Sequence, residues 1–312
     1  MSWGDADVSK AIRVKLPPTF STHTMYAITG AMLEPDTGCK HGLVELDFAA
    51  LARIRVGGVA ILCNLIEATH KANGLVHLVN FEKCPAADYL RGAGFMALYG
   101  DQPHDTRITG TPYLPVRKVE YAKSHSYISG RLIPWMASIL GEDERSLGTI
   151  QGCIGEIFNN IRDHSSVELG CCCGVYDEDE GTITICISDF GVGIPHNVRG
   201  YQGPEKSGSD EDAIAKACQQ GFSTHTTPGN MGVGLYYLME RVCGKYQSKV
   251  DIYSGKGIIL GSHNPSSRTK IRLLRKPAMG FYPGTLFYIT LNVRKFVPDP
   301  VEEPFAWEQS DF

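Results

Sequence analysis

The feature that most constrains this sequence is a set of four short motifs that follow one another in its second half. They are Glu156-Ile-Phe-Asn-Asn160, Asp189-Phe-Gly-Val-Gly193, Gly229-Asn-Met-Gly-Val-Gly234 and Gly284-Thr285. Apolar periodicity places the first on a helix, the second directly after a strand, the third directly before a helix and the fourth before the last strand. The second half therefore predicts an α/β unit of helices and a largely antiparallel sheet. We expect helices at 148–164 and 232–242, and its last three strands at 249–253, 269–274 and 285–293.

The first motif presents an acid and an amide on one helical face. Glu156 and Asn160 are four residues apart, and His164 follows four residues later. An amide oxygen such as that of Asn160 is a hard ligand that suits Mg²⁺, and a carboxylate one turn earlier is placed to orient or deprotonate a water or hydroxyl. His164 fits a functional role and a capping or core role equally well.

The second and third motifs combine an acid with glycines. Asp189 at a strand end can accept a hydrogen bond from the exocyclic amine of adenine, while Gly191 and Gly193 let a backbone approach the base closely. Gly232 and Gly234, ahead of a helix, expose N–H groups to phosphate. Neither cluster has the GxGxxG or GxxxxGK[ST] spacing, which excludes Rossmann and P-loop sites.

In this order the motifs resemble those of the GHKL ATPases, the family of gyrase B, the heat-shock chaperone ATPases, the histidine kinases and MutL. The resemblance covers about residues 141–297. It implies a two-layer α/β sandwich of the Bergerat type that binds ATP with Mg²⁺. By this resemblance Asn160 holds the metal, Glu156 is the catalytic base, Asp189 recognises adenine and Thr285 supports the base or its bound water.

The same resemblance assigns residues 196–231 to a lid over the nucleotide. Within it, Ser223 and Thr224 are similar to a phosphate-side segment of histidine-kinase-like members. The resemblance thus implies that they bind the nucleotide together with Gly191, Gly193, Gly232 and Gly234. The first motif ends in His164, and in this respect it resembles the motif of the anti-sigma-factor serine kinases, one branch of the family. A helix hairpin with a phosphoacceptor His-Glu or His-Asp pair does not precede the motifs, so we do not expect an autophosphorylating histidine kinase.

The first half shows an alternation of strands and helices. We expect strands at 43–48 and 76–80, and helices at 57–70 and 86–92. This stretch resembles a STAS-like domain (anti-sigma-factor antagonist) over about 75 residues. Such domains place a phosphorylatable serine in D-S-S-G before the central helix, whereas this chain has Arg55-Val-Gly-Gly58. The resemblance therefore implies a surface for a protein partner or a homodimer, and a bare scaffold is the alternative.

These patterns divide the chain into four parts. Residues 1–105 form the STAS-like domain, 106–140 a linker with a helix at 126–140, 141–297 the GHKL-type domain, and 298–312 a Pro-containing acidic tail. The fold class expected for the whole chain is α/β.

Charge and hydropathy restrict the partners. The formal net charge of −4 gives no global basic field, so nucleic acid is not an expected partner. The sequence contains neither an apolar run of about 18 residues nor a signal-peptide core, which predicts a cytoplasmic protein without a membrane span. The ten cysteines include no CxxC pair, and we expect the run Cys171–Cys173 to pack as small apolar residues in a strand.

Two functions follow from the sequence. The first is an enzyme that hydrolyses Mg-ATP, or transfers its phosphoryl group to a serine or threonine of a partner protein. The second is a module in which ATP changes the surface offered to a partner, with little or no turnover.

Overall fold

The computed structural model describes residues 11–34, 38–100, 112–164, 169–203, 208–222 and 234–301. The fold is α/β, with parallel and antiparallel sheets. The elements of the N-terminal unit are, in order, β1 (Ala11–Lys15), β2 (Thr19–Phe20), α1 (Met25–Met32), β3 (Leu33–Glu34), β4 (Gly38–Cys39), β5 (Leu43–Asp47), β6 (Arg53–Ile54), α2 (Val56–Lys71), β7 (Leu75–Val79), η2 (Phe81–Lys83), α3 (Ala87–Gly92) and α4 (Phe95–Tyr99).

The elements of the C-terminal unit follow, and two of its helical segments, η3 and η6, are π-helical. In order they are β8 (Tyr113–Glu120), α5 (Tyr121–Tyr127), η3 (Ile128–Leu132), α6 (Ile133–Leu140), η4 (Glu144–Leu147), α7 (Gly148–His164), β9 (Leu169–Asp177), β10 (Thr182–Ser188), α8 (Gly193–Gln202), α9 (Asp210–Ala217), α10 (Gly234–Met239), η6 (Glu240–Lys245), β11 (Lys249–His263), β12 (Ile271–Asn292) and η7 (Val293–Lys295).

The N-terminal unit contains a parallel sheet in the order β1-β5-β7. Parallel neighbours need a crossover, and α2 supplies it between β5 and β7. The strands and helices expected between residues 43 and 92 are confirmed. Sequence patterns had not indicated β1 or α1.

The C-terminal unit contains an antiparallel sheet in the order β11-β12-β10-β9-β8. Strands β11 and β12 are longer than expected and pair as far as His263 and Ile271. Their pairing is irregular between Ser254 and Gly257. The segments expected as separate strands at 269–274 and 285–293 belong to this one long strand, β12.

The prediction of a linker at 106–140 is wrong over the residues that the structure describes. Strand β8 pairs with β9 at the edge of the antiparallel sheet. Leu114, Ile128 and Met136 lie in the same buried cluster as the apolar residues of α7. Because these side chains belong to that core, residues 113–140 are an integral part of the C-terminal unit.

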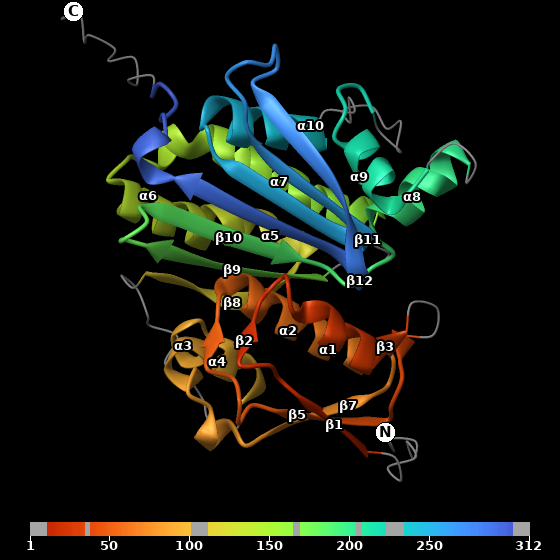
Figure 1. Ribbon diagram of the computed structural model, residues 1–312. Coiled ribbons are helices and arrows are strands. Elements are labelled where there is room, and N and C mark those ends of the chain that lie inside the picture. Colours follow the sequence, from red (N-terminus) through yellow and green to blue (C-terminus); the bar gives the residue numbers. More distant parts are fainter. Residues whose placement is uncertain are drawn as a thin grey trace, which may run out of the picture.

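Helices cover both faces of the antiparallel sheet (Figure 1). Helices α5, α6, α7 and α10 contribute to the core on one face, and α1 and α2 pack against the other. The expected two-layer sandwich is therefore extended by the N-terminal unit. Strand β9 shows this directly, since Cys172 lies in the first core while Cys171 and Cys173 lie in the second. The predicted burial of the three cysteines is confirmed.

Helix α2 is the central element of the second core. All its residues from Val56 to Ile66 are buried. A helix that is apolar on all sides is stable only when other elements surround it. Here the parallel sheet lies on one side and strands β9 and β10 on the other, as the middle layers of Figure 1 show.

The start of the predicted acidic tail is folded onto α7. The Asp299 carboxylate accepts hydrogen bonds from the Thr149 amide (2.6 Å) and hydroxyl (2.7 Å), and it pairs with Lys245 (2.6 Å). A carboxylate at the start of a helix satisfies amides that lack intrahelical partners. Residues 302–312 lie outside the described residues. Among the described helices, none is both long and apolar enough to cross a membrane.

Candidate functional site

Asp189 lies at the end of β10 in a buried position. It is 3% exposed, its backbone N–H donates to the Thr285 carbonyl (2.9 Å), and its Oδ1 accepts from the Gly191 amide (2.8 Å). Burial raises the pKa of the carboxyl to about 7, although backbone hydrogen bonds with Gly191 and Thr285 and the charge of Lys71 lower it in part. Within the described residues this carboxyl has no ion-pair partner, so it is a strong acceptor that lacks a cationic donor.

Backbone packs closely around Asp189 where glycines allow it. Gly284 has a φ of 70°, and a Cβ there would overlap the Asp189 carbonyl and carboxyl oxygens. Gly193 has a φ of 79°, and its Cβ would lie 2.6 Å from Ser254 Oγ. Both positions combine a left-handed conformation with a lack of space, so a side chain at either would displace the loop.

Ser254 and Thr285 join the glycine loops to the sheet. Ser254 Oγ donates to the Gly284 carbonyl (2.7 Å), accepts from the Ile194 amide (3.0 Å) and lies 3.2 Å from Thr285 Oγ1. All three side-chain and backbone partners lie next to Asp189 or at the start of α8. The predicted residues Asp189, Gly191, Gly193 and Thr285 are thus brought together, with Ser254 as an addition.

The N-terminal unit reaches the same site through Asn64. This residue of α2 is fully buried, and its amide nitrogen donates to the Asp189 carbonyl (2.7 Å) and to the Tyr282 hydroxyl (3.0 Å). The Tyr282 hydroxyl also lies 2.6 Å from Ser188 Oγ. Sequence reasoning missed Asn64, although a lone asparagine in an otherwise apolar run of a helix was a visible signal.

The amide oxygen of Asn64 is buried without a hydrogen-bond partner in the described structure. An unsatisfied buried acceptor costs about 1–3 kcal/mol, so a donor at this point would be favourable. Lys71, two turns further along α2, lies with its Nζ 5.7 Å from the centre of the Phe190 ring. Both residues place α2 against the loop that follows β10.

Glu156 and Asn160 lie together on α7, and Gly234 lies against them. A Cβ on Gly234 would be 2.9 Å from Glu156 Oε2 and 3.8 Å from Asn160 Nδ2. The α10 helix therefore begins directly at the acid and the amide. Asn160 Nδ2 donates to the Glu156 carbonyl (2.8 Å), which leaves Asn160 Oδ1 as the atom suited to a cation.

One face of α7 is apolar and packs into the core, so the polar Glu156 and Asn160 lie outside that face. Ile150, Ile154, Ile157 and Ile161 are all buried, at the three- and four-residue spacing of one helical stripe. Glu156 is half-buried and lies outside that stripe, where Asn159 Nδ2 approaches its Oε1 (3.4 Å).

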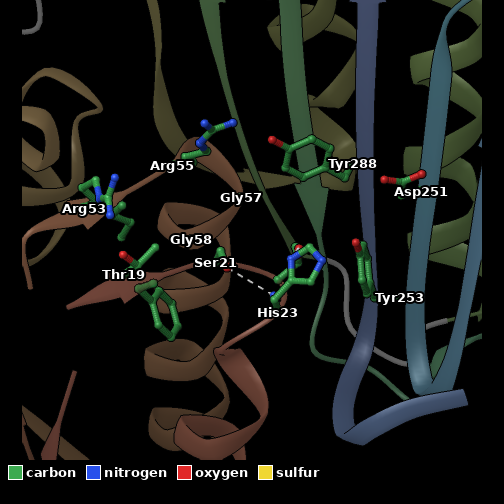
Figure 2. A pocket seen from close by; sticks show the side chains of 13 residues that line it. Thr19, Ser21, His23, Arg53, Arg55, Gly57, Gly58, Asp251, Tyr253 and Tyr288 are labelled. Atoms are coloured by element: carbon green, nitrogen blue, oxygen red, sulfur yellow. Dashed lines mark hydrogen bonds between the residues drawn. The ribbon is translucent and has the colours of Figure 1, made fainter. Parts of the chain in front are cut away.

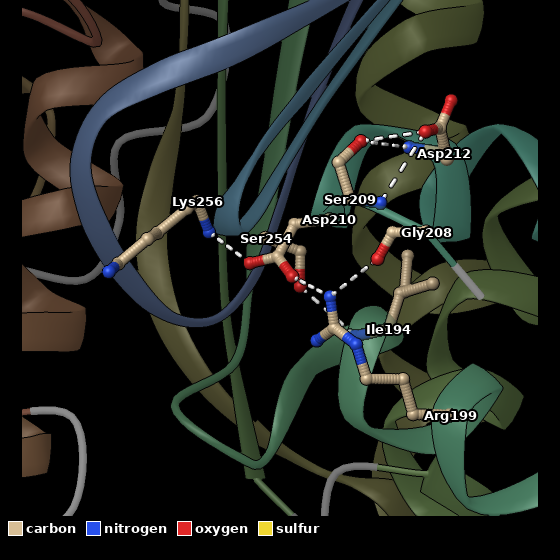
Figure 3. Close-up of polar contacts among 8 residues, drawn as sticks. All are labelled: Ile194, Arg199, Gly208, Ser209, Asp210, Asp212, Ser254 and Lys256. Atoms are coloured by element: carbon tan, nitrogen blue, oxygen red, sulfur yellow. Dashed lines mark hydrogen bonds and ion pairs between the residues drawn. The ribbon is translucent and has the colours of Figure 1, made fainter. Parts of the chain in front are cut away.

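Part of the predicted lid is folded against β11 (Figure 3). Asp210 at the start of α9 pairs with Arg199 of α8 and accepts from the Lys256 amide (2.6 Å). Ser209 and Asp212 form a capping box that fixes the first turn of α9. Helices α8 and α9 therefore form a fixed border of this region.

Several predicted site residues lie outside the described residues. These are Ser223, Thr224 and Gly232, together with the last part of the expected lid. His164 ends α7, but its side chain is likewise outside the described part. The assignments of these residues stay predictions.

The described residues fit an adenine nucleotide with Mg²⁺ by their chemistry. The buried Asp189 carboxyl, which has no counterion among the described residues, can accept a hydrogen bond from an N–H donor, and the edge of adenine has such a donor. No cluster of three or more His, Cys, Asp or Glu suited to a metal occurs in the described part of the chain. Mg²⁺ bound through one amide would therefore take its other ligands from phosphates and water.

The chain matches no family model, and a search of the curated proteins found no match. The assignment of a function therefore depends on the residues described above.

Proposed function

We propose that this chain binds Mg-ATP between α7, the end of β10 and the start of α10, in the manner of a GHKL-type ATPase. The observation that carries the proposal is the buried Asp189 carboxyl, which has no ion-pair partner among the described residues. Glycine at 284 allows the backbone to pack directly against it. Such a carboxyl binds a ligand that brings its own N–H donor. The exocyclic amine of adenine is a donor of this kind.

The second part of the proposed site consists of polar residues that would bind the metal ion and the phosphates. Asn160 Oδ1 would ligate Mg²⁺, and Glu156 would orient or deprotonate the attacking water or hydroxyl. Bound Mg-ATP would supply an activated γ-phosphoryl group. Glycine at 234 keeps the start of α10 close enough for its backbone amides to approach phosphate.

A fluorescent ATP analogue tests the binding site. We expect saturable, Mg²⁺-dependent binding to the wild type and at least a tenfold loss in Asp189→Asn, which equals about 1.4 kcal/mol. Asp179→Asn is the matched control, because this exposed aspartate lies in the turn at the opposite end of β10. Equal binding by both variants would remove Asp189 from the site.

The reaction is tested by comparing the turnover of ATP by Glu156→Ala with that of the wild type, and analogue binding is measured alongside. Phosphate release or labelling of a partner serine or threonine should fall by at least a hundredfold while analogue binding is retained, since general-base catalysis contributes about 10²–10⁴-fold. Equal turnover by wild type and variant would show that Glu156 is not the base.

A binding module with little turnover is the second candidate. The contact of Asn64 with the Asp189 carbonyl favours it, because nucleotide at Asp189 would act directly on a helix of the N-terminal unit. Sustained phosphate release by the purified protein would count against this candidate. A STAS-like docking role or a homodimer would need surfaces other than the largely buried α2.

A further inference from the structure

A pocket separate from the proposed ATP site lies between the two units (Figure 2). Its volume is about 500 Å³, within the range of pockets that hold small molecules. The N-terminal unit contributes β2, β6 and the start of α2, and the C-terminal unit contributes β11 and β12. Its lining is not shared with any residue of the proposed ATP site.

One side of the pocket is cationic. Arg53 and Arg55 line it and are exposed, and in the described structure neither guanidinium forms an ion pair. Helix α2 begins here at Val56, and no side chain of the described residues caps its first turn. Two unpaired guanidinium groups beside free helix amides favour an anionic group.

One wall of the pocket is aromatic. Tyr253 and Tyr288 extend from the antiparallel sheet toward His23 and the start of α2 (Figure 2). Gly57 has no side chain to fill this space, and a Cβ there would lie 2.7 Å from the Tyr288 ring. Because Tyr288 pairs with Asp251 and Tyr253 is two residues further along β11, both rings lie on the same face of the sheet, and this one aromatic wall suits the face of a flat apolar group.

Asp251 lies at the far side of the pocket, beyond the two tyrosines (Figure 2). It is half-buried and, in the part of the chain that the structure describes, has no ion pair. A carboxylate at this end repels a simple anion but accepts a hydrogen bond from an amine or hydroxyl. The ligand therefore needs a donor opposite its anionic group.

We propose that this pocket binds a small aromatic acid whose anionic group lies at Arg53 and Arg55 and whose amine or hydroxyl donor faces Asp251. The aromatic ring lies against Tyr253 and Tyr288.

Helix α2 connects this pocket to Asp189, a step that rests on the proposed ATP site. Gly57, Asn64 and Lys71 recur every seven residues and so share one face of the helix. Gly57 contacts Tyr288 in the pocket, Asn64 donates to the Asp189 carbonyl, and Lys71 lies over Phe190. A ligand that shifts the start of α2 acts on Asp189 through this face.

The pocket is tested with 4-aminobenzoate as the probe, by saturation-transfer NMR and titration. We expect saturable binding to the wild type and to Asp189→Asn, and binding at least tenfold weaker to Arg55→Ala. Benzoate, which lacks the amine, and aniline, which lacks the carboxylate, should each bind at least tenfold more weakly. Arg145→Ala is the matched control, because this exposed arginine pairs with Asp143 and neither residue lines the pocket.

No saturable binding at millimolar probe, or equal binding by wild type and Arg55→Ala, would overturn the pocket. Thermal unfolding of each variant, followed by circular dichroism, shows whether a variant that does not bind the probe is still folded.

Coupling is measured as the change in affinity for the ATP analogue when the probe saturates the pocket. A change of at least threefold is expected in the wild type and none in Asn64→Leu. An unchanged affinity in the wild type would refute the coupling and leave the pocket intact. Probe binding without any binding of the ATP analogue would refute the proposed function alone.

Discussion

Burial of the Asp189 carboxyl makes the stability of the folded protein depend on pH. Its pKa is about 7 in the folded protein, against an ordinary value of 3.8. The folded state therefore holds this proton more tightly than the unfolded chain. The resulting stabilisation is complete below pH 4 and is lost as the pH rises through 7.

Asp189→Asn should remove this dependence. The free energy of unfolding of the wild type, relative to the variant, should fall by a few kcal/mol between pH 4 and pH 7.5, at about 1.4 kcal/mol per pKa unit. Urea denaturation at a series of pH values measures the difference. Asp179→Asn, at an exposed position, should follow the wild type, and parallel pH profiles for wild type and Asp189→Asn would contradict the assignment.

Local sequence indicated Gly191 and Gly193 near Asp189 because their positions are set by neighbours in the chain, whereas the distant Thr285 was indicated only by the family resemblance. Gly191 and Gly193 follow the aspartate directly, and Glu156 and Asn160 share a helix turn. Asn64 bonds to an atom 125 residues away. Short-range periodicity cannot indicate such a partner, since it depends on how α2 docks onto the sheet.

At the scale of elements, one carboxylate of α9 makes polar contacts that link this helix to α8 and to β11. Asp210 pairs with Arg199, and its other oxygen accepts from the Lys256 amide. A Cβ on Gly257 would lie 2.5 Å from the Glu211 amide, so the helix and the strand are in close backbone contact. Removal of the Asp210 carboxylate would leave the Lys256 amide without this acceptor and the Arg199 guanidinium with only its longer bond to the Gly208 carbonyl (3.4 Å).

Asp210→Ala should loosen α9 without unfolding the sheet. We expect a loss of about 1–3 kcal/mol in the local stability of α9, because partly buried charged hydrogen bonds are lost. Hydrogen exchange of the α9 amides should accelerate accordingly, while that of β10 stays slow. The neighbouring substitution Glu211→Ala is the control, and equal exchange in both variants would show that the Asp210 contacts are not needed.

Elements with a clear apolar period could be predicted from sequence, and those whose form depends on neighbours could not. Helix α7 was predicted over Gly148–His164, the range observed. Strand β8 was missed because Pro115 interrupts its pattern. Proline is tolerated there because β8 lies at the edge of the sheet, where one side of the strand needs no partner.

At the scale of the molecule, the two units share a core. The buried cluster around α2 combines Val59 and Leu62 with Cys173, Tyr282 and Leu286 of the antiparallel sheet. Separation of the units would expose apolar surface on both. The boundary expected from sequence near residue 105 therefore does not mark two independent folding units.

Unfolding should accordingly occur in one cooperative transition. In differential scanning calorimetry the calorimetric and van't Hoff enthalpies should agree, and fluorescence and far-UV circular dichroism should give the same midpoint. Two resolved transitions, one for each unit, would show that the shared core contributes little to stability.

The buried thiols give this shared core a chemical consequence. Nine cysteines of the described chain are free and buried, and burial raises the thiol pKa of those next to α2, such as Cys173 and Cys186. Thiolates are the reactive form, so these side chains stay inert toward oxidants while the layers remain together. Five of the nine thiols lie in this shared core and four in the core on the other face of the sheet, so cooperative unfolding brings all nine nucleophiles into solvent together. Thermal unfolding in air should therefore be irreversible and should give disulfide-linked chains. In a reducing buffer the protein should refold on cooling.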